Sequence, residues 1–271
     1  MPELPEIANR TREIQENLIG KQIASITIIQ PKCLNCPPEE FQASLNGAVI
    51  QSARYKGKWI FVETTQGWLL LNMGMGGEMI LTDPQHLPEK NRLIFHFADQ
   101  TCLSVNFWWF GYAHYVPTGQ LDQHEMSAKL GPNVLDLSPE EFSTLLSSKK
   151  GQLKSFLLNQ SNLAGIGNAY IHDILFFAGL HPLRPIPTLS SDEIARLYAA
   201  IRKGLTMSLE KGGAWYELNL YGQKGGFTLE DLVIAYKDNQ PCPSCGTPIQ
   251  KLKTGSTSSF LCPACQPLDN R

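Results

Sequence analysis

The sequence has no long hydrophobic segment. None of its apolar runs approaches the ~18 consecutive residues of a membrane-spanning helix, and its acidic start lacks the basic and apolar regions of a secretory signal peptide. It also has no low-complexity tract, and its composition is that of an ordinary globular protein. These absences disfavour membrane and secreted proteins. We therefore expect a cytoplasmic protein, and its length alone suggests about two domains.

An excess of positive charge is also missing. The 23 Lys and Arg residues are balanced by 25 Asp and Glu residues, which gives a formal net charge of −2. Proteins that neutralise phosphates are usually basic, so the total charge gives no support for nucleic-acid binding. Basic side chains such as Lys149, Lys150 and Lys154 do occur in the second half of the chain. A basic face there is compatible with the sequence but is not required by it.

Cysteine is scarce, and four of the seven cysteines form two pairs near the C-terminus. Cys242 and Cys245 make one C-x2-C motif, and Cys262 and Cys265 make a second after sixteen intervening residues. This is the spacing of a structural zinc ribbon, in which each knuckle points two thiolates at one metal ion. We therefore predict that these four cysteines bind one structural Zn²⁺. Disulfide bonds are the alternative, but they are rare in cytoplasmic proteins.

The other three cysteines have no such arrangement. Cys33 and Cys36 form another C-x2-C motif, but no second pair lies nearby. We interpret them as free thiols in a loop, with a redox pair as the alternative. Cys102 lies in an apolar segment and is expected in the core.

The N-terminus carries a candidate nucleophile. Pro2 is a small second residue, so removal of Met1 by an aminopeptidase would expose a secondary amine. Such an amine attacks carbonyl and sugar carbons, and its adduct is a charged iminium that withdraws electrons. Glu3 and Glu6 are close enough in sequence to move protons. The alternative is a solvated N-terminus in which Pro5 merely occupies the first turn of a helix.

The hydrophobic pattern predicts an α+β protein. Residues 5–18 have the apolar spacing of a helix, and residues 22–116 form short β runs separated by turns, which predicts an antiparallel β-sandwich or barrel. The expected strands are Ile23–Ile29, Val49–Tyr55, Trp59–Glu63, Trp68–Asn72, Glu78–Leu81, Leu93–Phe97 and Cys102–Phe107. The expected later helices are residues 139–148, 151–159, 168–178 and 190–210. Ser138 and Ser190 each begin one of these helices with a capping box.

Although the length alone suggests about two domains, the change of pattern along the chain predicts three. They are an N-terminal β-sandwich with its helix (residues 1–130), a helical domain (131–238) and a C-terminal zinc ribbon hairpin (239–271). Two glycine-containing segments leave alternatives open. The Leu163–Asn168 turn is either a plain αα-hairpin or a phosphate-binding turn, and residues 212–239 are either a linker or a mobile loop with stacking aromatics.

The N-terminal motif and several others resemble the formamidopyrimidine-DNA glycosylase and endonuclease VIII family. The matching segments occur in the family's order and cover essentially the whole chain. They are Pro2–Ile7, Lys56–Lys58, Asn72–Gly77, Phe110–Gly111, Gly165–Tyr170, Ala178–Pro182 and the four-cysteine finger. Leu4 and the Met-Gly-Met-Gly-Gly turn are closer to the formamidopyrimidine branch, which prefers oxidised purines. The resemblance implies a helix–two-turns–helix element in the helical domain.

The resemblance also implies a reaction. The nitrogen of Pro2 would attack C1′ of a damaged nucleotide while Glu3 assists departure of the base. Successive β- and δ-eliminations from the iminium would then cut the strand. Lys58 matches a lysine that contacts phosphate near the lesion, and Glu6 matches a second carboxylate lining the site. The implied protein is a bifunctional glycosylase and lyase of base-excision repair. It would be a monomer that associates with the nucleoid by binding damaged double-stranded DNA.

Other residues match positions that hold DNA. A damaged base must leave the helix to react, and a side chain then fills the gap. Met75 matches the methionine that enters the stack, and Phe110 matches the aromatic that inserts on the opposite strand. Asn168 and Lys154 match DNA-contacting residues of the helical domain.

The chain departs from the family in its DNA-reading residues. Trp108 stands where an arginine usually reads the base opposite the lesion, and Asn72 stands where a histidine is common. The finger segment Thr254–Phe260 has no arginine to hold phosphate, and Lys253 is the nearest cation. A guanidinium offers paired donors that a lysine does not, so partner-base selectivity and DNA affinity are both in question.

Three hypotheses therefore remain for the function. The first is a glycosylase and lyase acting on formamidopyrimidine and 8-oxoguanine, with oxidised pyrimidines as the alternative substrates. The second is a binder of damaged or abasic DNA with little excision activity. The third is a zinc ribbon protein that binds protein partners, which leaves the N-terminal motif unexplained.

Overall fold

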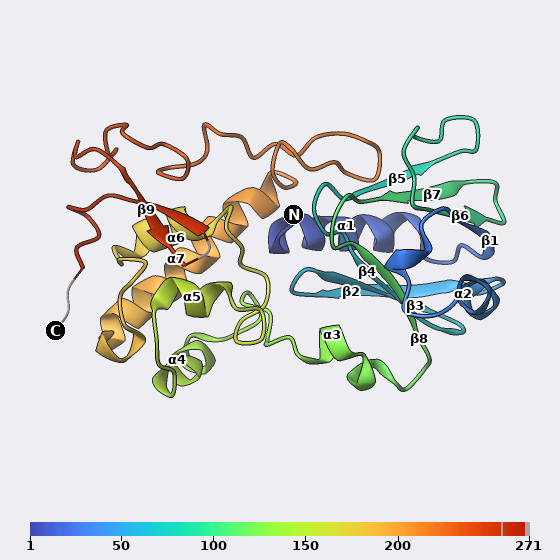
Figure 1. Ribbon diagram of the computed structural model, residues 1–271, viewed down its shortest axis with the longest axis horizontal. Helices are drawn as coiled ribbons and strands as arrows, with labels where there is room; N and C mark the ends of the chain where they lie inside the picture. The colour runs from blue at the N-terminus through green and yellow to red at the C-terminus, as the bar shows by residue number, and fades with distance from the viewer. Residues whose placement is uncertain (256, 269–271) are drawn as a thin grey trace. The chain divides into compact units, whose positions relative to one another are not determined.

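The computed structural model describes residues 1–255 and 257–268 and divides the chain into two compact units (Figure 1). The first unit consists of Met1–Lys129 and Leu209–Phe227, and the second consists of Leu130–Ser208 and the chain from Thr228 onwards. Residues 209–227, which the sequence pattern grouped with the helices, thus belong to the first unit. Ser256 and residues 269–271 of the expected zinc ribbon lie outside the described residues.

The first unit is a sandwich of two four-stranded antiparallel sheets, as predicted. One sheet has the order β1 (Ile23–Ile28), β6 (Leu93–Phe97), β7 (Cys102–Asn106) and β5 (Glu78–Thr82). The other has the order β2 (Ile50–Lys56), β3 (Trp59–Thr64), β4 (Gly67–Asn72) and β8 (Tyr112–Val116). The sequence pattern missed β8, because its polar residues and the neighbouring Gly111 and Pro117 weaken the β signal.

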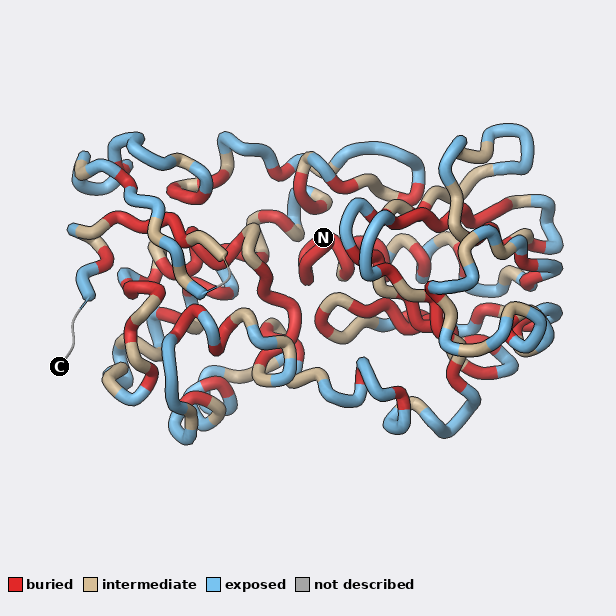
Figure 2. Tube along the Cα trace, viewed as in Figure 1, coloured by how far each residue is buried: buried red, intermediate tan, exposed pale blue. Residues whose placement is uncertain are grey.

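The core of the first unit lies between the sheets and helix α1 (Leu4–Asn17). On α1, Ile7 and Ile14 are fully buried among residues from both sheets. The apolar spacing of the helix therefore directs one side into the sandwich. Short helices α2 (Pro38–Leu45) and α3 (Glu125–Ala128) complete this unit. Figure 2 shows that buried residues follow the strands and helices, whereas the connecting loops are largely exposed.

Among its described residues, the second unit contains four α-helices and a β-hairpin. The helices are α4 (Pro139–Ser147), α5 (Leu153–Leu158), α6 (Ile171–Ala178) and α7 (Ser191–Glu210), and the hairpin strands are β9 (Gln250–Thr254) and β10 (Thr257–Leu261). The capping boxes predicted at Ser138 and Ser190 are both present. Helix α6 begins at Ile171 rather than at Asn168, because the glycine-containing turn continues for three more residues. Among the described residues, no helix is both long and apolar enough to cross a membrane.

Candidate active site

The N-terminus is built into the start of α1. Pro2 is buried, and Glu3 is the N-cap of the helix with Pro5 in its first turn. Glu3 and Glu6 form a reciprocal capping box, in which the backbone N of Glu3 donates to Glu6 Oε2 at 2.8 Å. Both carboxylates are buried. Met1 is 44% exposed, and Pro5 occupies the first turn as the alternative also expected, but Pro2 and the two carboxylates are withdrawn from solvent.

Glu6 also fastens the glycine-rich loop to the N-terminus. Its Oε1 accepts a hydrogen bond of 3.1 Å from the backbone N of Ala214. Gly213 has a φ of +99°, and a Cβ there would lie 3.1 Å from Glu6 Cγ. Only glycine meets both conditions without strain. The loop is thus part of the N-terminal site within the first unit.

Met1 lies between two side chains of potential catalytic importance. Its nitrogen is 3.9 Å from Glu217 Oε1, and its Sδ is 4.0 Å from Lys58 Nζ. Lys58 occupies the turn between β2 and β3. Removal of Met1 would leave free the space that its nitrogen occupies beside Glu217 and its sulfur occupies beside Lys58.

Asn72 connects Lys58 to the neighbouring loop. Its Nδ2 donates to the backbone O of Lys58 at 3.2 Å, and its Oδ1 accepts from the backbone N of Gly74 at 3.0 Å. Both hydrogen bonds hold backbone groups, so Asn72, the residue where the resemblance suggested histidine, connects two loops of the first unit.

Four exposed apolar side chains form a second feature, the aromatic tip, which we define as Met75, Trp108, Trp109 and Phe110. Their side chains are 48%, 64%, 64% and 66% exposed. Hydrophobic side chains exposed next to one another usually mark a binding surface. The tip has no charged side chain, so a binding partner would contact these side chains through stacking and apolar packing.

The tip is held in shape by its backbone. Met75 N donates to Trp109 O at 2.9 Å, and Trp108 N donates to Met75 O at 3.0 Å. A Cβ at Gly74 would lie 2.2 Å from Trp109 O, so this close approach requires glycine. Phe110 has a φ of +55°, which aromatic residues rarely adopt. Strain of this kind is characteristic of functional loops.

In the second unit, Lys154 is buried beneath the β9–β10 hairpin. Its side chain is enclosed, with the residue 2% exposed. Burial lowers the pKa of Lys154 to about 8. The ammonium donates to four oxygens of the hairpin, Thr254 Oγ1, Thr257 Oγ1, Ser258 O and Ser259 Oγ, at 2.7–3.1 Å. Lys154 therefore joins α5 to the hairpin in this structure, whereas the resemblance implied a contact with DNA.

We expect Lys154→Met to weaken the attachment of the hairpin. The substitution keeps most of the volume but removes the donor shared by four oxygens, and hydrogen bonds to a charged group contribute about 2 kcal/mol. Hydrogen exchange should become faster in β9 and β10, and the melting temperature should fall. Lys253→Met on the exposed side of the hairpin is the matched control. Equal exchange in both variants would contradict the assigned role.

Asn168 lies in the turn before α6. Its side chain is partly exposed, and its Oδ1 is buried without a hydrogen-bond partner among the described residues.

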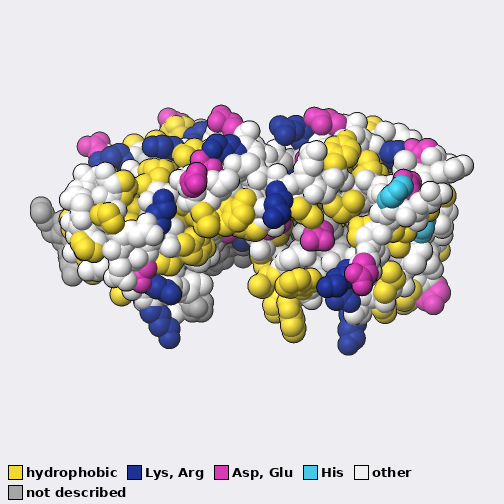
Figure 3. All heavy atoms as spheres, turned by 90° about the horizontal axis from the view of Figure 1, so that it is seen from above, with side chains coloured by type: hydrophobic (Ala, Val, Ile, Leu, Met, Phe, Trp, Pro, Cys, Tyr) yellow, Lys and Arg dark blue, Asp and Glu magenta, His cyan; other side chains and the backbone are white. Residues whose placement is uncertain are grey.

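Basic side chains do not gather into one continuous patch on the face drawn in Figure 3, where Lys and Arg alternate with acidic and hydrophobic groups. This mixture of basic and acidic side chains agrees with the formal net charge of −2.

The four C-terminal cysteines converge as the spacing predicted. Their Sγ atoms all lie within 4.8 Å of one another, and the Cys242–Cys265 and Cys245–Cys262 separations are 3.8 and 3.5 Å. Zn–S bonds of about 2.3 Å in a tetrahedron put the sulfurs about 3.8 Å apart. A disulfide would need about 2.05 Å. The residues present fit one structural zinc ion.

The remaining cysteines are inert by environment. Cys33 and Cys102 are buried, and Cys36 packs against the core. Burial raises the pKa of Cys33 to about 11 and also raises that of Cys36. Because the thiolate is the reactive form, these environments favour free thiols over a redox pair.

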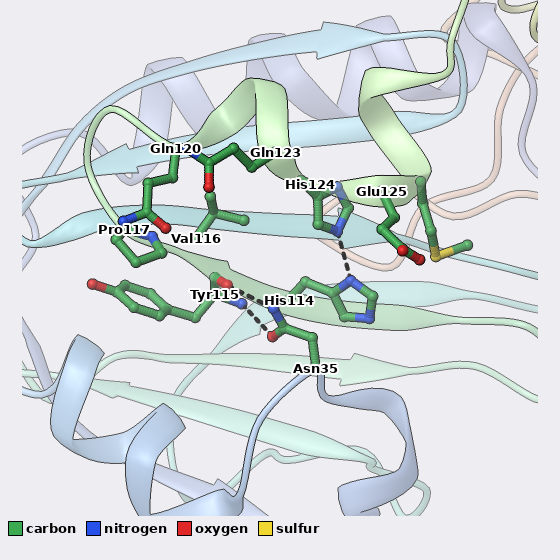
Figure 4. Close-up of a pocket in the computed structure, with 10 residues that line it drawn as sticks. Asn35, His114, Tyr115, Val116, Pro117, Gln120, Gln123, His124 and Glu125 are labelled. Atoms are coloured by element: carbon green, nitrogen blue, oxygen red, sulfur yellow. Dashed lines mark hydrogen bonds between the residues drawn. The ribbon is translucent and has the colours of Figure 1, made fainter.

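A hollow of about 410 Å³ in the first unit lies beside two histidines (Figure 4). His114 Nδ1 and His124 Nε2 are 2.8 Å apart, and His124 Nδ1 accepts from the backbone N of Ser127 at 3.3 Å. His124 therefore donates from Nε2 to His114. Burial lowers the pKa of His114 to about 4 and also lowers that of His124. Both rings are neutral at pH 7, and they connect β8 to α3.

Sequence reasoning missed three features of the first unit. Trp109 could have been noticed, since four consecutive aromatic residues precede Gly111. Glu217 gave no signal, because it lies more than two hundred positions from the N-terminus that it faces. The pairing of His114 with His124 depended on β8, which the pattern did not predict.

Three family models match successive parts of this chain. The formamidopyrimidine-DNA glycosylase N-terminal domain matches residues 1–106, and the formamidopyrimidine-DNA glycosylase H2TH domain matches residues 130–218. The zinc finger found in FPG and IleRS matches residues 239–268. These matches confirm the predicted family resemblance and the predicted zinc finger.

Curated relatives match over nearly their whole length. The sequence is 34% identical to the formamidopyrimidine-DNA glycosylase of Streptococcus pneumoniae over 277 residues, covering 99% of this chain and 100% of the relative. It is 32% identical to that of Listeria innocua, covering 98% and 100%.

Solved structures give the same result. The fold matches Lactococcus lactis Fpg in complex with DNA containing an abasic site, with a TM-score of 0.89, 27% identity, and coverage of 98% of this chain and 99% of that chain. A Lactococcus lactis Fpg complex with Fapy-dG-containing DNA matches with a TM-score of 0.88, 27% identity, and coverage of 98% and 100%. The α+β fold class is thereby confirmed.

Proposed function

The chain belongs to the formamidopyrimidine-DNA glycosylase family, and from that premise we propose that it excises formamidopyrimidine and 8-oxoguanine and then cleaves the strand at the resulting abasic site. Family membership makes it a DNA glycosylase of base-excision repair. The lyase step, the choice of lesion, a monomeric state and action in the cytoplasm are parts of the proposal.

One observation carries the proposal, namely the placement of Pro2. The residue is buried at the start of α1, beside the Glu3–Glu6 capping box, and Met1 lies between Glu217 and Lys58 in front of it. Without Met1, the secondary amine of Pro2 would face that space. A nucleophile needs both a lone pair and a fixed direction of attack, and the helix start supplies the direction.

The reaction would use these residues in sequence. The lone pair of Pro2 forms a bond to C1′, and the bond from C1′ to the base breaks with its electron pair going to the base. The adduct nitrogen then loses its proton, and its lone pair forms the C=N bond of the iminium as the C1′–O4′ bond breaks and Glu3 supplies a proton to O4′. Lys58 holds a phosphate next to the lesion by its charge. Loss of a C2′ proton from the iminium starts β-elimination, and δ-elimination follows. The zinc ion would hold the finger together and take no part in these steps.

The test is an activity assay on several substrates. Duplexes containing 8-oxoguanine, formamidopyrimidine, an oxidised pyrimidine or an abasic site are incubated with the protein, and products with and without alkali are compared. Strand cleavage without alkali is expected on the purine lesions and on the abasic site. Lactococcus lactis Fpg has also been crystallised with oxidised-pyrimidine DNA, so faster cleavage of that substrate would favour the alternative specificity.

A DNA binder with little excision activity is the second candidate. It is favoured by the aromatic tip, which has no arginine, and by the absence of arginine among the described residues of the β9–β10 hairpin. Tight binding to abasic DNA without cleavage in the same assay would support this candidate against the first.

We predict weak discrimination among the bases opposite the lesion. Trp108 is exposed and offers a stacking surface, but its single N–H donor does not distinguish base edges as an arginine does. Excision rates of the unaltered protein should therefore agree within about threefold for the four opposing bases, whereas a reading contact is worth about 1–3 kcal/mol. Trp108→Arg should increase the spread, and Trp109→Arg is the control. Strong preference in the unaltered protein would show that another residue reads the base.

A further inference from the structure

Three carboxylates of the first unit lie near the N-terminus, and their hydrogen bonds separate their roles. Both oxygens of Glu6 accept backbone hydrogen bonds, one from Glu3 and one from Ala214. The carboxylate of Glu3 accepts from the backbone of Glu6 in the capping box. Both oxygens of Glu6 and one oxygen of Glu3 are therefore engaged in holding the backbone at the start of α1 and in the loop.

Glu217 has different surroundings. It is 8% exposed, and its Oε1 is 3.9 Å from the nitrogen of Met1. Its backbone is fixed in the loop, since its N donates to Ala214 O at 3.0 Å and its O accepts from Gly225 N at 3.1 Å. A Cβ at Gly225 would lie 2.2 Å from Gly213 O, so the loop closes tightly on itself. The carboxylate is thus presented to the N-terminus by a defined backbone.

We propose that Glu217 is the proton acceptor for the N-terminal amine once Met1 has been removed. This inference rests on the proposed use of Pro2 as the nucleophile. In the step, one N–H bond of the Pro2 ammonium breaks and an O–H bond forms on Glu217. The products are a neutral amine and a neutral carboxylic acid. The freed lone pair then attacks C1′.

The electrostatics of the site support this step. Burial raises the pKa of Glu217 to about 7, and the charged groups that face it are the N-terminal amine, Glu6, Arg10 and Glu3. An α-amino group titrates near pH 8, so transfer to a carboxylate of pKa about 7 is unfavourable by about tenfold. Transfer to an ordinary glutamate of pKa about 4.3 would be unfavourable by about 5,000-fold. A proton acceptor matched to the pH of the reaction is the more efficient one.

The position of Pro2 relative to Glu217 follows from chain geometry. Its nitrogen is one residue beyond that of Met1, a separation below the 3.8 Å between successive Cα atoms. Glutamate has three rotatable bonds, and loss of Met1 empties the space between the two groups. The Pro2 nitrogen is therefore within about 7.7 Å of Glu217 Oε1, and rotation of the glutamate side chain would bring the carboxylate towards the amine.

The test is the pH dependence of adduct formation by Glu217→Gln. Protein that begins at Pro2 is mixed with abasic duplex and borohydride between pH 5.5 and 9.5, and the rate of trapping is measured. At pH 7, where Glu217 is partly ionised and the amine is still largely protonated, the variant should be about threefold slower than the unaltered protein. At pH 9.5 the two rates should converge, because the amine is then neutral without an acceptor. Glu217→Asp should recover part of the rate, and Glu16→Gln, at an exposed position on α1, is the control.

The outcomes separate this inference from the proposed function. An equal loss of rate by Glu217→Gln at every pH would assign Glu217 a purely structural role and overturn the inference, as would an unchanged profile. Absence of any trapped adduct with the unaltered protein would instead reject Pro2 as the nucleophile. Circular dichroism and melting temperature of each variant establish that the first unit is folded.

Discussion

Protein that retains Met1 is expected to show no base excision and no strand cleavage, a loss on the order of 1,000-fold or more, as for removal of other catalytic nucleophiles. In that form the nitrogen of Pro2 is an amide without a basic lone pair. Met1 also fills the space between Glu217 and Lys58. Both the nucleophile and access to it are therefore lost.

The comparison needs two proteins that differ only at the N-terminus. One carries an uncleaved extension before Pro2, and the other has the same extension removed by a protease so that Pro2 is the first residue. Binding to abasic DNA in the absence of borohydride reports whether the extension merely blocks the DNA. Equal excision by both proteins would contradict the assignment of Pro2.

Loss of the zinc ion should have the second largest effect. The described residues near the finger share only a small apolar cluster centred on Ile234, Ile249 and Phe260. Binding of structural zinc contributes about 10–16 kcal/mol to the folding of comparable zinc-finger peptides. We therefore expect Cys262→Ser to release the metal, unfold the β9–β10 hairpin and reduce DNA binding by about 100-fold or more.

Elemental analysis checks this directly. Protein purified without chelator should contain one zinc ion per chain, and Cys262→Ser should contain almost none. A double variant, Cys33→Ser with Cys36→Ser, is the control and should keep its zinc. Absence of zinc from the unaltered protein, or full DNA binding by Cys262→Ser, would contradict the role given to the finger.

The parts of the site that could be predicted from the sequence are those encoded by neighbouring residues. The Pro2–Ile7 motif, the capping boxes at Ser138 and Ser190, and the paired C-x2-C knuckles are all local patterns whose geometry follows from spacing. The β-sandwich was predictable for the same reason, because alternating apolar residues and turn residues define each strand separately.

The parts that could not be predicted depend on contacts between distant segments. Glu217 faces the N-terminus only because Glu6 binds the backbone of Ala214 and glycine at position 213 allows that approach. From the sequence alone Lys154 is expected at the surface, because the hairpin that encloses it lies about one hundred positions later. Each is a tertiary contact, and nothing in the local sequence indicates it.

The central claim is that Pro2 forms the covalent bond to DNA, and mapping of the trapped adduct tests it most directly. Protein beginning at Pro2 is trapped on an abasic duplex with borohydride, digested with a protease, and analysed by mass spectrometry. We predict that the sugar remnant is attached to the peptide that starts at Pro2, on its terminal nitrogen. A remnant on a lysine such as Lys58, with the Pro2 peptide unmodified, would contradict the claim.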